Sequence, residues 1–373
     1  MNADIVVIGG GIVGSAIAYG LARRKVRVAV LDGSDRDVRA ANANFGLVWL
    51  QGKGTNMPAY QRWTRKSIQL WPEFSAELTE ATGIDLQYEC DGGLTITLGE
   101  ADFEKRRATI ERLAEQLGDL EPDCHMIDRR ELESVLPGVR LGSEVTGASY
   151  GRSDGHANPL RLLAALHAET VRNGGELLGG CAVQRIQRDA SGSFLVDYGS
   201  GRVSAARVVI AAGLGSKELA AQVGLDIQIR PQRGQILVTE RVEPFLPLPT
   251  SGLRQTREGT VMIGATMDEA GFDTSTTAEA AAALGAKAIR RVPALAGLNL
   301  VRQWAGLRIL TPDRHPVYAE SKSHPGAYVA VCHSGVTLAA VHAADIAHAF
   351  ASGQLPASLN VFHHSRFDVS KAA

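Results

Sequence analysis

Short apolar runs and longer amphipathic segments alternate along the chain, and their spacing predicts its secondary structure. The runs 5–8, 26–31, 207–213 and 327–331 are typical of buried parallel strands, whose two faces both lie against helices. Helices are predicted at 60–82, 100–117, 160–173, 279–291 and 336–350. Further strands, several of them antiparallel, are predicted at 92–98, 182–188, 194–198, 234–240, 259–264 and 304–313. The pattern as a whole predicts an α/β protein.

Three glycines, Gly9, Gly11 and Gly14, follow the first apolar run with the spacing of a dinucleotide-binding turn. The first allows a tight turn, the second lets the backbone approach a pyrophosphate, and the third lets the next helix pack on the sheet. The second strand ends at Asp32, whose carboxylate can accept both hydroxyls of an adenosine ribose. Strand, turn, helix, strand and acid in this order predict a nucleotide site. The pattern alone does not separate NAD from FAD.

Length and composition narrow the possible function classes. With 373 residues the chain is long enough for about two domains. Lys plus Arg (39) nearly equal Asp plus Glu (40), so no bulk charge recruits nucleic acid or an anionic membrane. The four cysteines lie far apart, which predicts reduced thiols, a cytoplasmic protein and no metal site. No apolar run approaches the length of a transmembrane segment, and we expect no cleaved signal.

Several motifs taken together resemble the D-amino acid oxidase superfamily of FAD flavoproteins over nearly the whole chain. Besides the glycine turn, they are Asp154-Gly155-His156 up to Pro159, Ala211-Ala212-Gly213, Gly264-Ala265-Thr266 with Gly271-Phe272-Asp273, Gly306-Leu307-Arg308, and the turn before the last helix. Residues 43–54 and 333–338 look most like one subgroup, the flavoprotein subunits of bacterial opine oxidases, D-hydroxyproline dehydrogenases and hydrogen cyanide synthase. Two positions depart from the family pattern: Arg314 stands where a glycine is usual, and Asp32 where a glutamate is commoner.

The resemblance implies two domains, each assembled from separate stretches of chain. A Rossmann-like FAD-binding domain would comprise residues 1–48, 150–218 and 302–373. A discontinuous substrate domain would comprise 49–149 and 219–301 and be built on a large mixed, mainly antiparallel sheet. The order of the predicted strands agrees with this division, because the antiparallel signals fall between the parallel ones.

The glycine turn and the resemblance together assign one set of residues to FAD. Residues 43–47 are mostly small, so they form either a surface loop or a strip beneath the flavin ring, where Asn44 could bond the ring edge. The whole set is Gly9, Gly11, Ile12, Val13, Gly14, Asp32, Gly33, Ala43, Asn44, Phe45, Gly46, Leu47, Val183, Ala211, Ala212, Gly213, Gly306, Arg308, Ser334, Gly335, Val336, Thr337 and Leu338.

Oxidation of an amine beside a carboxylate needs a flavin to accept hydride, a fixed cation for the carboxylate and a dry pocket. Arg308 is the candidate carboxylate anchor, because a guanidinium makes two bonds to a carboxylate. The alternative is a structural arginine at a strand end. Arg302 and Arg254 are further substrate-binding candidates. His333 is the second catalytic candidate, with a structural role in its turn as the alternative, and its use as a base for Ser334 is disfavoured because adjacent side chains rarely face each other.

We therefore expect FAD-dependent oxidation of the C–N bond of an amino acid or secondary amine, of D-hydroxyproline, opine or D-amino acid type. The alternatives are a glycine- or sarcosine-type oxidase that uses oxygen directly, and a flavin-carrying electron-relay subunit of a larger complex. An NAD dehydrogenase is a more distant alternative. Partner subunits carrying an iron–sulfur cluster or a second flavin are expected, since the chain has no cysteine cluster of its own. In the cytoplasm, only such a partner would hold the protein to the inner membrane.

Overall fold

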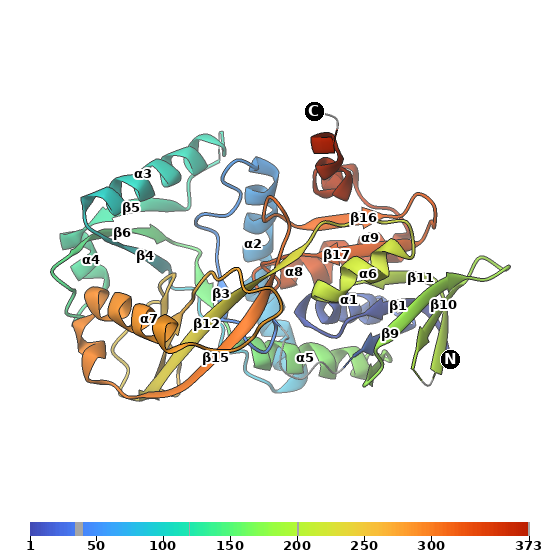
Figure 1. The fold of residues 1–373 in the computed structure, drawn as a ribbon, viewed down its shortest axis with the longest axis horizontal. Coiled ribbons are helices and arrows are strands. Elements are labelled where there is room, and N and C mark those ends of the chain that lie inside the picture. Colours follow the sequence, from blue (N-terminus) through green and yellow to red (C-terminus); the bar gives the residue numbers. More distant parts are fainter. Residues whose placement is uncertain (34–39, 119, 200, 372–373) are drawn as a thin grey trace.

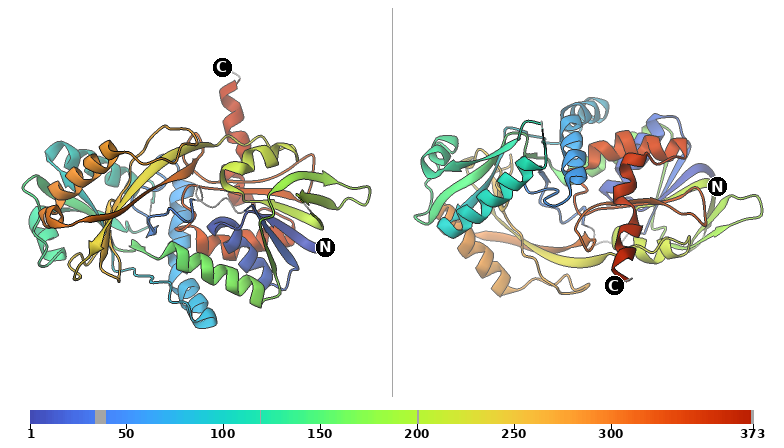
Figure 2. Two further views of the ribbon diagram at one scale, coloured as in Figure 1. Left: turned by 60° about the horizontal axis from the view of Figure 1, so that its bottom comes forward. Right: turned by 90° about the horizontal axis from the view of Figure 1, so that it is seen from above.

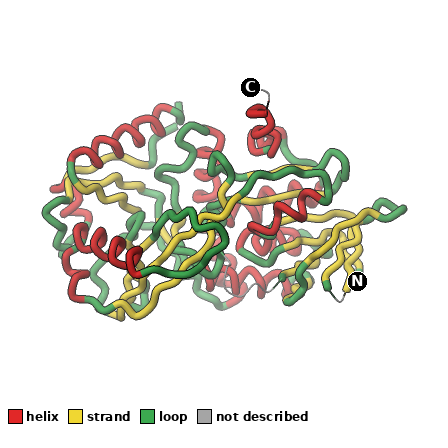
Figure 3. Tube along the Cα trace, viewed as in Figure 1, coloured by secondary structure: helices red, strands yellow, loops and turns green. Residues whose placement is uncertain are grey.

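The computed structural model describes residues 1–33, 40–118, 120–199 and 201–371, which form two lobes joined by long strands (Figures 1 and 2). Strands run through both lobes, and helices lie against them (Figure 3). Among the helices of these described residues, none is both long and apolar enough to cross a membrane.

An eight-stranded sheet organises the first lobe. Its strands are β1 (Asn2–Ile8), β2 (Val28–Asp32), β8 (Glu176–Gly179), β9 (Val183–Arg188), β10 (Phe194–Tyr198), β11 (Gly201–Ile210), β16 (Val317–Glu320) and β17 (Ala327–Val331). The main path is β16-β17-β11-β1-β2-β8, and the β9–β10 hairpin pairs with β11. The central pairs are parallel, so the carboxyl ends of β1, β2 and β11 meet at one edge. Open α/β sheets bind their ligands at such an edge.

Both faces of the central strands of this sheet are buried, as the apolar runs predict. Ile5 and Val7 of β1 pack on one face against α1 (Ile12–Arg23) and the last helices of the chain. Val6 and Ile8 pack on the other face, against α6 (Ser216–Ala221) and the β9–β10 hairpin. Helix α5 (Pro159–Arg172) lies beside α1.

The second lobe contains two smaller antiparallel sheets. In one, β12 (Arg230–Arg241) lies between β14 (Thr260–Gly264) and β15 (Leu300–Leu310), with β13 (Leu253–Gln255) at the edge. In the other, β6 (Val145–Gly151) lies between β4 (Gly93–Leu98) and β5 (Cys124–Asp128). An isolated parallel bridge pairs Leu94 of β4 with Thr250, which precedes β13, so the predicted mixed, mainly antiparallel sheet takes the form of two adjoining antiparallel sheets. Helices α4 (Arg129–Val135) and α7 (Ala278–Arg291) share their apolar core.

The remaining elements connect or cover the lobes. Helix α2 stands between the lobes (Figure 1), and β3 pairs with β7. These elements are α2 (Pro58–Thr82), β3 (Leu47–Val48) and β7 (Gly155–His156), and a further helix is α3 (Glu100–Glu115). Short 3-10 helices cover Gly213–Gly215, Pro293–Gly297, Ala357–Phe362 and His364–Lys371. Strand β15 spans the predicted domain boundary at residue 302, and the division into two domains stays a prediction.

The last helix differs from the predicted helix over 336–350. Residues 335–338 form turns, and α8 covers only Ala339–Val341. A π-helical turn, His342–Ile346, follows before α9 (Ala347–Ser352). Within the wide turn the buried His342 bonds to the hydroxyl of Tyr318, at 2.8 Å from Nε2 to oxygen. A pattern of apolar positions carries no information about this tertiary bond, so it could not predict the interruption.

Candidate active site

The turn between β1 and α1 has the space that a phosphate group requires. Gly9 has a φ of +106°, and a Cβ there would lie 2.4 Å from the Ala211 carbonyl oxygen. A Cβ at Gly14 would lie 1.9 Å from the Gly9 carbonyl oxygen. By contrast, a Cβ at Gly11 would enter space with nothing within 4 Å. Packing thus requires Gly9 and Gly14, whereas Gly11 leaves room beside the backbone for a bound pyrophosphate.

Residues from three strands gather around this turn. Asp32 accepts a hydrogen bond from the Gly10 N–H, at 2.6 Å, so its carboxylate is tied to the glycine turn. The Cys181 N–H donates to the Asp32 carbonyl at 2.7 Å, which brings Val183 to the same edge of the sheet. Directly after β2 and β11 come Gly33, Ala211, Ala212 and Gly213. The expected contact of Asp32 with a ribose stays a prediction.

Residues 43–47 lie against β15 rather than in solvent. A Cβ at Gly306 would meet the Ala43 Cβ at 2.3 Å, so only glycine permits this approach. The side-chain oxygen of Asn44 accepts from the Gly46 N–H at 2.7 Å and holds the turn. Leu47 begins β3, and Phe45 packs beside Gly264.

The turn at residues 333–338 closes against the same region. Thr337 accepts a hydrogen bond from the Trp49 N–H and donates one to the Leu47 carbonyl, both at 3.2 Å. A Cβ at Gly335 would lie 3.2 Å from Val13 Cγ2, so this turn also contacts the first turn of α1, which Ile12 begins. Val336 and Leu338 are buried beneath it.

A cavity of about 490 Å³ lies where these segments meet. Small-molecule sites typically measure roughly 300–1,000 Å³. The predicted residues that line it are Ala43, Asn44, Phe45, Leu47, Gly306, Arg308, His333, Ser334, Val336 and Thr337. The structure therefore brings together residues from three distant parts of the sequence. The glycine turn and the residues around Asp32 lie outside this lining, as expected for a dinucleotide whose phosphates and ring occupy different places.

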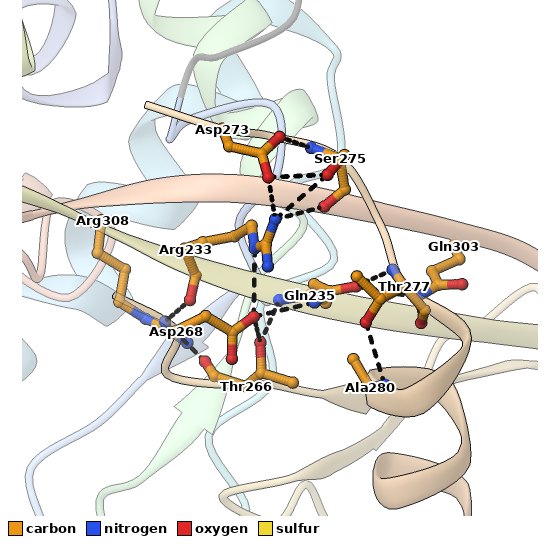
Figure 4. Close-up of polar contacts among 10 residues, drawn as sticks. All are labelled: Arg233, Gln235, Thr266, Asp268, Asp273, Ser275, Thr277, Ala280, Gln303 and Arg308. Atoms are coloured by element: carbon orange, nitrogen blue, oxygen red, sulfur yellow. Dashed lines mark hydrogen bonds and ion pairs between the residues drawn. The ribbon is translucent and has the colours of Figure 1, made fainter. Parts of the chain in front are cut away.

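Arg308 faces the cavity from β15 and is held from behind by a polar network (Figure 4). Its Nη1 donates to the carbonyl oxygens of Thr266 at 2.8 Å and Arg233 at 3.3 Å. Asp268 accepts from the Thr266 hydroxyl, at 2.9 Å, and forms an ion pair with Arg233. The guanidinium lies across Gly234, where a Cβ would be 2.6 Å from both Nη atoms. Glycine at that position is what allows the arginine to lie flat.

Within the described residues Arg308 has no ion-pair partner, although Asp268 is near enough to act through space. Burial lowers the pKa of Arg308, but an arginine remains charged throughout the physiological range. Its side-chain hydrogen bonds to these residues use Nη1 alone. Nη2 and Nε therefore remain as donors for a ligand carboxylate.

The other two predicted arginines lie elsewhere. Arg302 is exposed on β15, outside the cavity lining, with its guanidinium 5.4 Å from the centre of the Trp304 ring. Arg254 is 4% exposed and sits behind Gly46, where burial lowers its pKa to about 10. It contacts His156 and the Met262 sulfur and also lies outside the lining. The structure thus brings only Arg308 of the three to the cavity.

His333 is exposed toward the cavity that it lines. Desolvation by the surrounding protein lowers the pKa of His333, and the positive charges of Lys53, Arg308 and Arg314 act in the same direction. The imidazole is therefore neutral near pH 7. Ser334 Oγ lies 3.5 Å from His333 Nδ1, too long for an activated nucleophile.

Lys53 is a cavity residue that sequence reasoning did not single out. Its Nζ donates to Ser334 Oγ at 2.7 Å, and the Tyr60 hydroxyl donates to the same oxygen at 3.0 Å. Burial lowers the pKa of Lys53 to about 8, although Cys332 and Asp154 oppose the shift. The available signal was a lysine between two glycines just after the small-residue segment, which by itself is common in surface turns.

Comparison with known proteins supports the assignment of the fold and of the cofactor. An opine oxidase subunit of Agrobacterium tumefaciens is 41% identical over 370 residues, which cover 99% of each chain. The HcnC subunit of hydrogen cyanide synthase from Pseudomonas aeruginosa is 30% identical and covers 99% of this chain, which in turn covers 97% of it. The crystal structure of glycine oxidase from Geobacillus kaustophilus superposes with a TM-score of 0.88 at 25% identity, over 98% and 99% of the two chains.

The model of the DAO family, described as FAD dependent oxidoreductase, matches residues 4–349. Two of the relatives are named as subunits, so these relatives belong to larger complexes. The resemblance and the cofactor predicted from the sequence are thereby confirmed. The space beside Gly11 and the volume of the cavity agree with the binding of FAD. The chain belongs to the DAO family of FAD dependent oxidoreductases.

Proposed function

We propose that this enzyme oxidises the C–N bond of an amino acid or secondary amine that carries a carboxylate beside the reacting carbon. The observation that carries the proposal is the Arg308 guanidinium, open to a cavity that residues 43–47 also line. Relatives named as oxidases of opines and of glycine support this reaction class. Loss of a hydride and a proton from the substrate yields an imine, which water converts to a carbonyl compound and an amine.

Bound FAD supplies the hydride acceptor, and the protein supplies position and charge. Arg308 would bind the substrate carboxylate through Nη2 and Nε, because Nη1 is already used by the two backbone carbonyls. The neutral His333 and the Lys53–Ser334 pair would border the reacting amine and offer it hydrogen-bonding groups. A residue that removes the amine proton is not required, since an amine can lose this proton to solvent before it reacts.

An anaerobic screen tests the function directly. The purified holoenzyme is mixed with D-amino acids, hydroxyprolines, sarcosine, glycine and N-carboxyalkyl amino acids, and the flavin absorbance is followed. Bleaching by at least one of these compounds is the expected result. A protein that carries a full complement of FAD and is bleached by none of them would instead be an electron-relay subunit.

We also propose that the chain works beside partner subunits that carry an iron–sulfur cluster or a second flavin. Two relatives are named as subunits, which supports an assembly. The four cysteines of this chain are free and separate, and no group of three or more His, Cys, Asp or Glu within the described residues is arranged to hold a metal ion. An iron–sulfur relay would therefore need thiolates from another chain.

A further inference from the structure

The charges that line the cavity are all of one sign. Among the lining residues that the structure describes, none is acidic, and the basic ones are Lys53, Lys287, Arg291, Arg308 and Arg314. These five cations repel one another. Asp102 and Asp268 offset this repulsion only through space, without an ion pair to any of the five, and a bound anion would offset it further. A single substrate carboxylate at Arg308 accounts for only one of these five residues.

The basic residues come from two different parts of the fold. Lys53, Arg308 and Arg314 lie with His333 and Ser334 toward the first lobe, and Lys53 contacts Ser334 directly. Lys287 and Arg291 come from α7, which packs on β12 and β14 in the second lobe (Figure 1). Ser251 and Gly252 line the cavity on this side, and a Cβ at Gly252 would lie 3.0 Å from Arg291 Nη1. Basic residues from both lobes therefore line the same cavity.

The pair on α7 is unfavourable without a ligand. Residues four apart on a helix lie side by side, so the two like charges repel, and Arg291 is the main cause of a lowered pKa of Lys287. Neither side chain forms a hydrogen bond or ion pair with another described residue, and the Nε of Arg291 is buried without a partner. Asp102 on α3 acts on both through space but forms no ion pair with either. The helix dipole favours cations in the last turn, which accounts for Arg290 and Arg291 but not for Lys287.

The cofactor does not account for this pair either. The negative charges of FAD are on its pyrophosphate, and the structure offers the glycine turn at Gly9 to Gly14 for that group. None of those glycines lines the cavity. A second anionic group of the substrate is the remaining candidate.

We propose that the substrate carries a second carboxylate, remote from the C–N bond that is oxidised, and that this carboxylate binds between Lys287 and Arg291. The substrate class is then an N-carboxyalkyl amino acid rather than a simple amino acid. The position of the reacting C–N bond is taken from the proposed function. The second anion site is inferred from Lys287 and Arg291 alone.

Matched substrates test the proposal on the holoenzyme. N-(carboxyalkyl)glycines with one, two or three methylenes are compared with the corresponding carbamoylalkyl compounds, in which an amide replaces the second carboxylate. The wild type should prefer the best acid over its own amide by at least about tenfold in kcat/KM, as a charged hydrogen bond warrants. An equal kcat/KM for every acid and its amide would overturn the proposal.

Variants on α7 test whether Lys287 and Arg291 cause the preference for the acid over the amide. Lys287→Gln and Arg291→Gln should each reduce the preference for the acid severalfold, mainly through KM, while kcat/KM for the amide changes little. Arg290→Gln is the matched control, because Arg290 is in the same helical turn but pairs with Glu144 outside the cavity. A preference retained in both cavity variants, or lost equally in the control, would contradict the assignment. Lys287 is exposed, so its variant should fold even if Arg291→Gln does not.

Binding separates this inference from the proposed reaction. Isothermal calorimetry compares glutarate with 4-carbamoylbutyrate, which differ only in the second carboxylate and contain no oxidisable amine. Tighter binding of glutarate that Lys287→Gln abolishes would support the second anion site even if the holoenzyme oxidised no amine. Equal binding of the two compounds by the wild type would overturn the site, whatever amines are oxidised.

Discussion

At the scale of single residues, the candidate site combines one firmly held charge with one that can be switched. Arg308 lies flat over Gly234 and is fixed by the Thr266 and Arg233 carbonyls. Lys53 depends on a hydroxyl for its contact, and burial brings its pKa to about 8. The two cations are therefore expected to respond differently to substitution and to pH.

Replacing Arg308 should damage catalysis without removing the cofactor. Truncating one partner of a desolvated charge pair costs about 2–5 kcal/mol, so Arg308→Ala should lower kcat/KM roughly thirtyfold to several thousandfold. Arg308→Lys should recover only part, because an ammonium cannot make the two-bond fork. Steady-state kinetics of both variants, with flavin occupancy measured alongside, test this prediction.

Arg302→Ala on the same strand is the control and should behave as wild type, since Arg302 lies outside the cavity. Wild-type kcat/KM in Arg308→Ala would reduce this arginine to a structural role.

The charge of Lys53 should make anion binding depend on pH. Below about pH 8 the ammonium adds to the positive potential of the cavity, and above that pH the group is neutral. The dissociation constant of acetate, followed by the flavin spectrum, should therefore rise as the pH increases from 7 to 9 in the wild type. Acetate has no group that titrates in this range. Lys53→Met should bind acetate more weakly at pH 7 and lose this dependence, and an unchanged profile in the variant would exclude Lys53 as its source.

At the scale of elements, a buried turn joins the segments around the cavity. Asp154 lies between β6 and β7, is 0% exposed, and accepts hydrogen bonds from the Leu50 N–H and the Gln51 side chain. Gln51 also donates to the Gly93 carbonyl, at 3.0 Å, at the start of β4. One carboxyl group thus connects three stretches of chain. Burial raises the pKa of Asp154 from 3.8 to about 7, despite these bonds.

This raised pKa should appear in the stability of the fold. Between about pH 4 and pH 7 the native protein retains a proton on Asp154 that the unfolded chain has lost, so stability falls as the pH rises through this window. Each pH unit within this window lowers the free energy of unfolding by about 1.4 kcal/mol. From pH 5 to 6.5 the wild type should therefore lose about 2 kcal/mol relative to Asp154→Asn, which has no proton to lose. Urea unfolding at both values measures the difference, and parallel pH profiles of the two proteins would refute it.

The elements also show what the sequence could predict. Strand β17 was predicted at its observed bounds, and α7 to within one residue, because apolar run length and helical periodicity are local properties. Arg308 was identified from a motif. Lys53 was missed because its partner Ser334 lies 281 positions away, and no local pattern records that contact. The mainly antiparallel character of the second lobe was predicted, whereas its arrangement as two sheets depends on long-range strand pairing that no local pattern records.

At the scale of the whole molecule, the proposed partners make a kinetic prediction. If electrons normally pass to another subunit, the chain expressed alone should transfer them poorly to oxygen. With its best substrate, hydrogen peroxide formation should be about tenfold slower or more than reduction of an artificial dye, a barrier difference of at least about 1.4 kcal/mol. Parallel assays of peroxide and dye reduction measure this. A stable isolated chain that forms peroxide as fast as it reduces the dye would be a simple oxidase.

The arrangement of the cavity also bears on how the protein is made. Its lining begins at Ala40 and ends at Thr337, and in the sheet that supports the nucleotide turn β11 lies beside β1 and β17 lies beside β11. A chain growing on the ribosome therefore cannot complete the flavin pocket until residue 337 has been translated. An incomplete translation product that ends before β17 lacks both a supporting strand and one wall of the pocket.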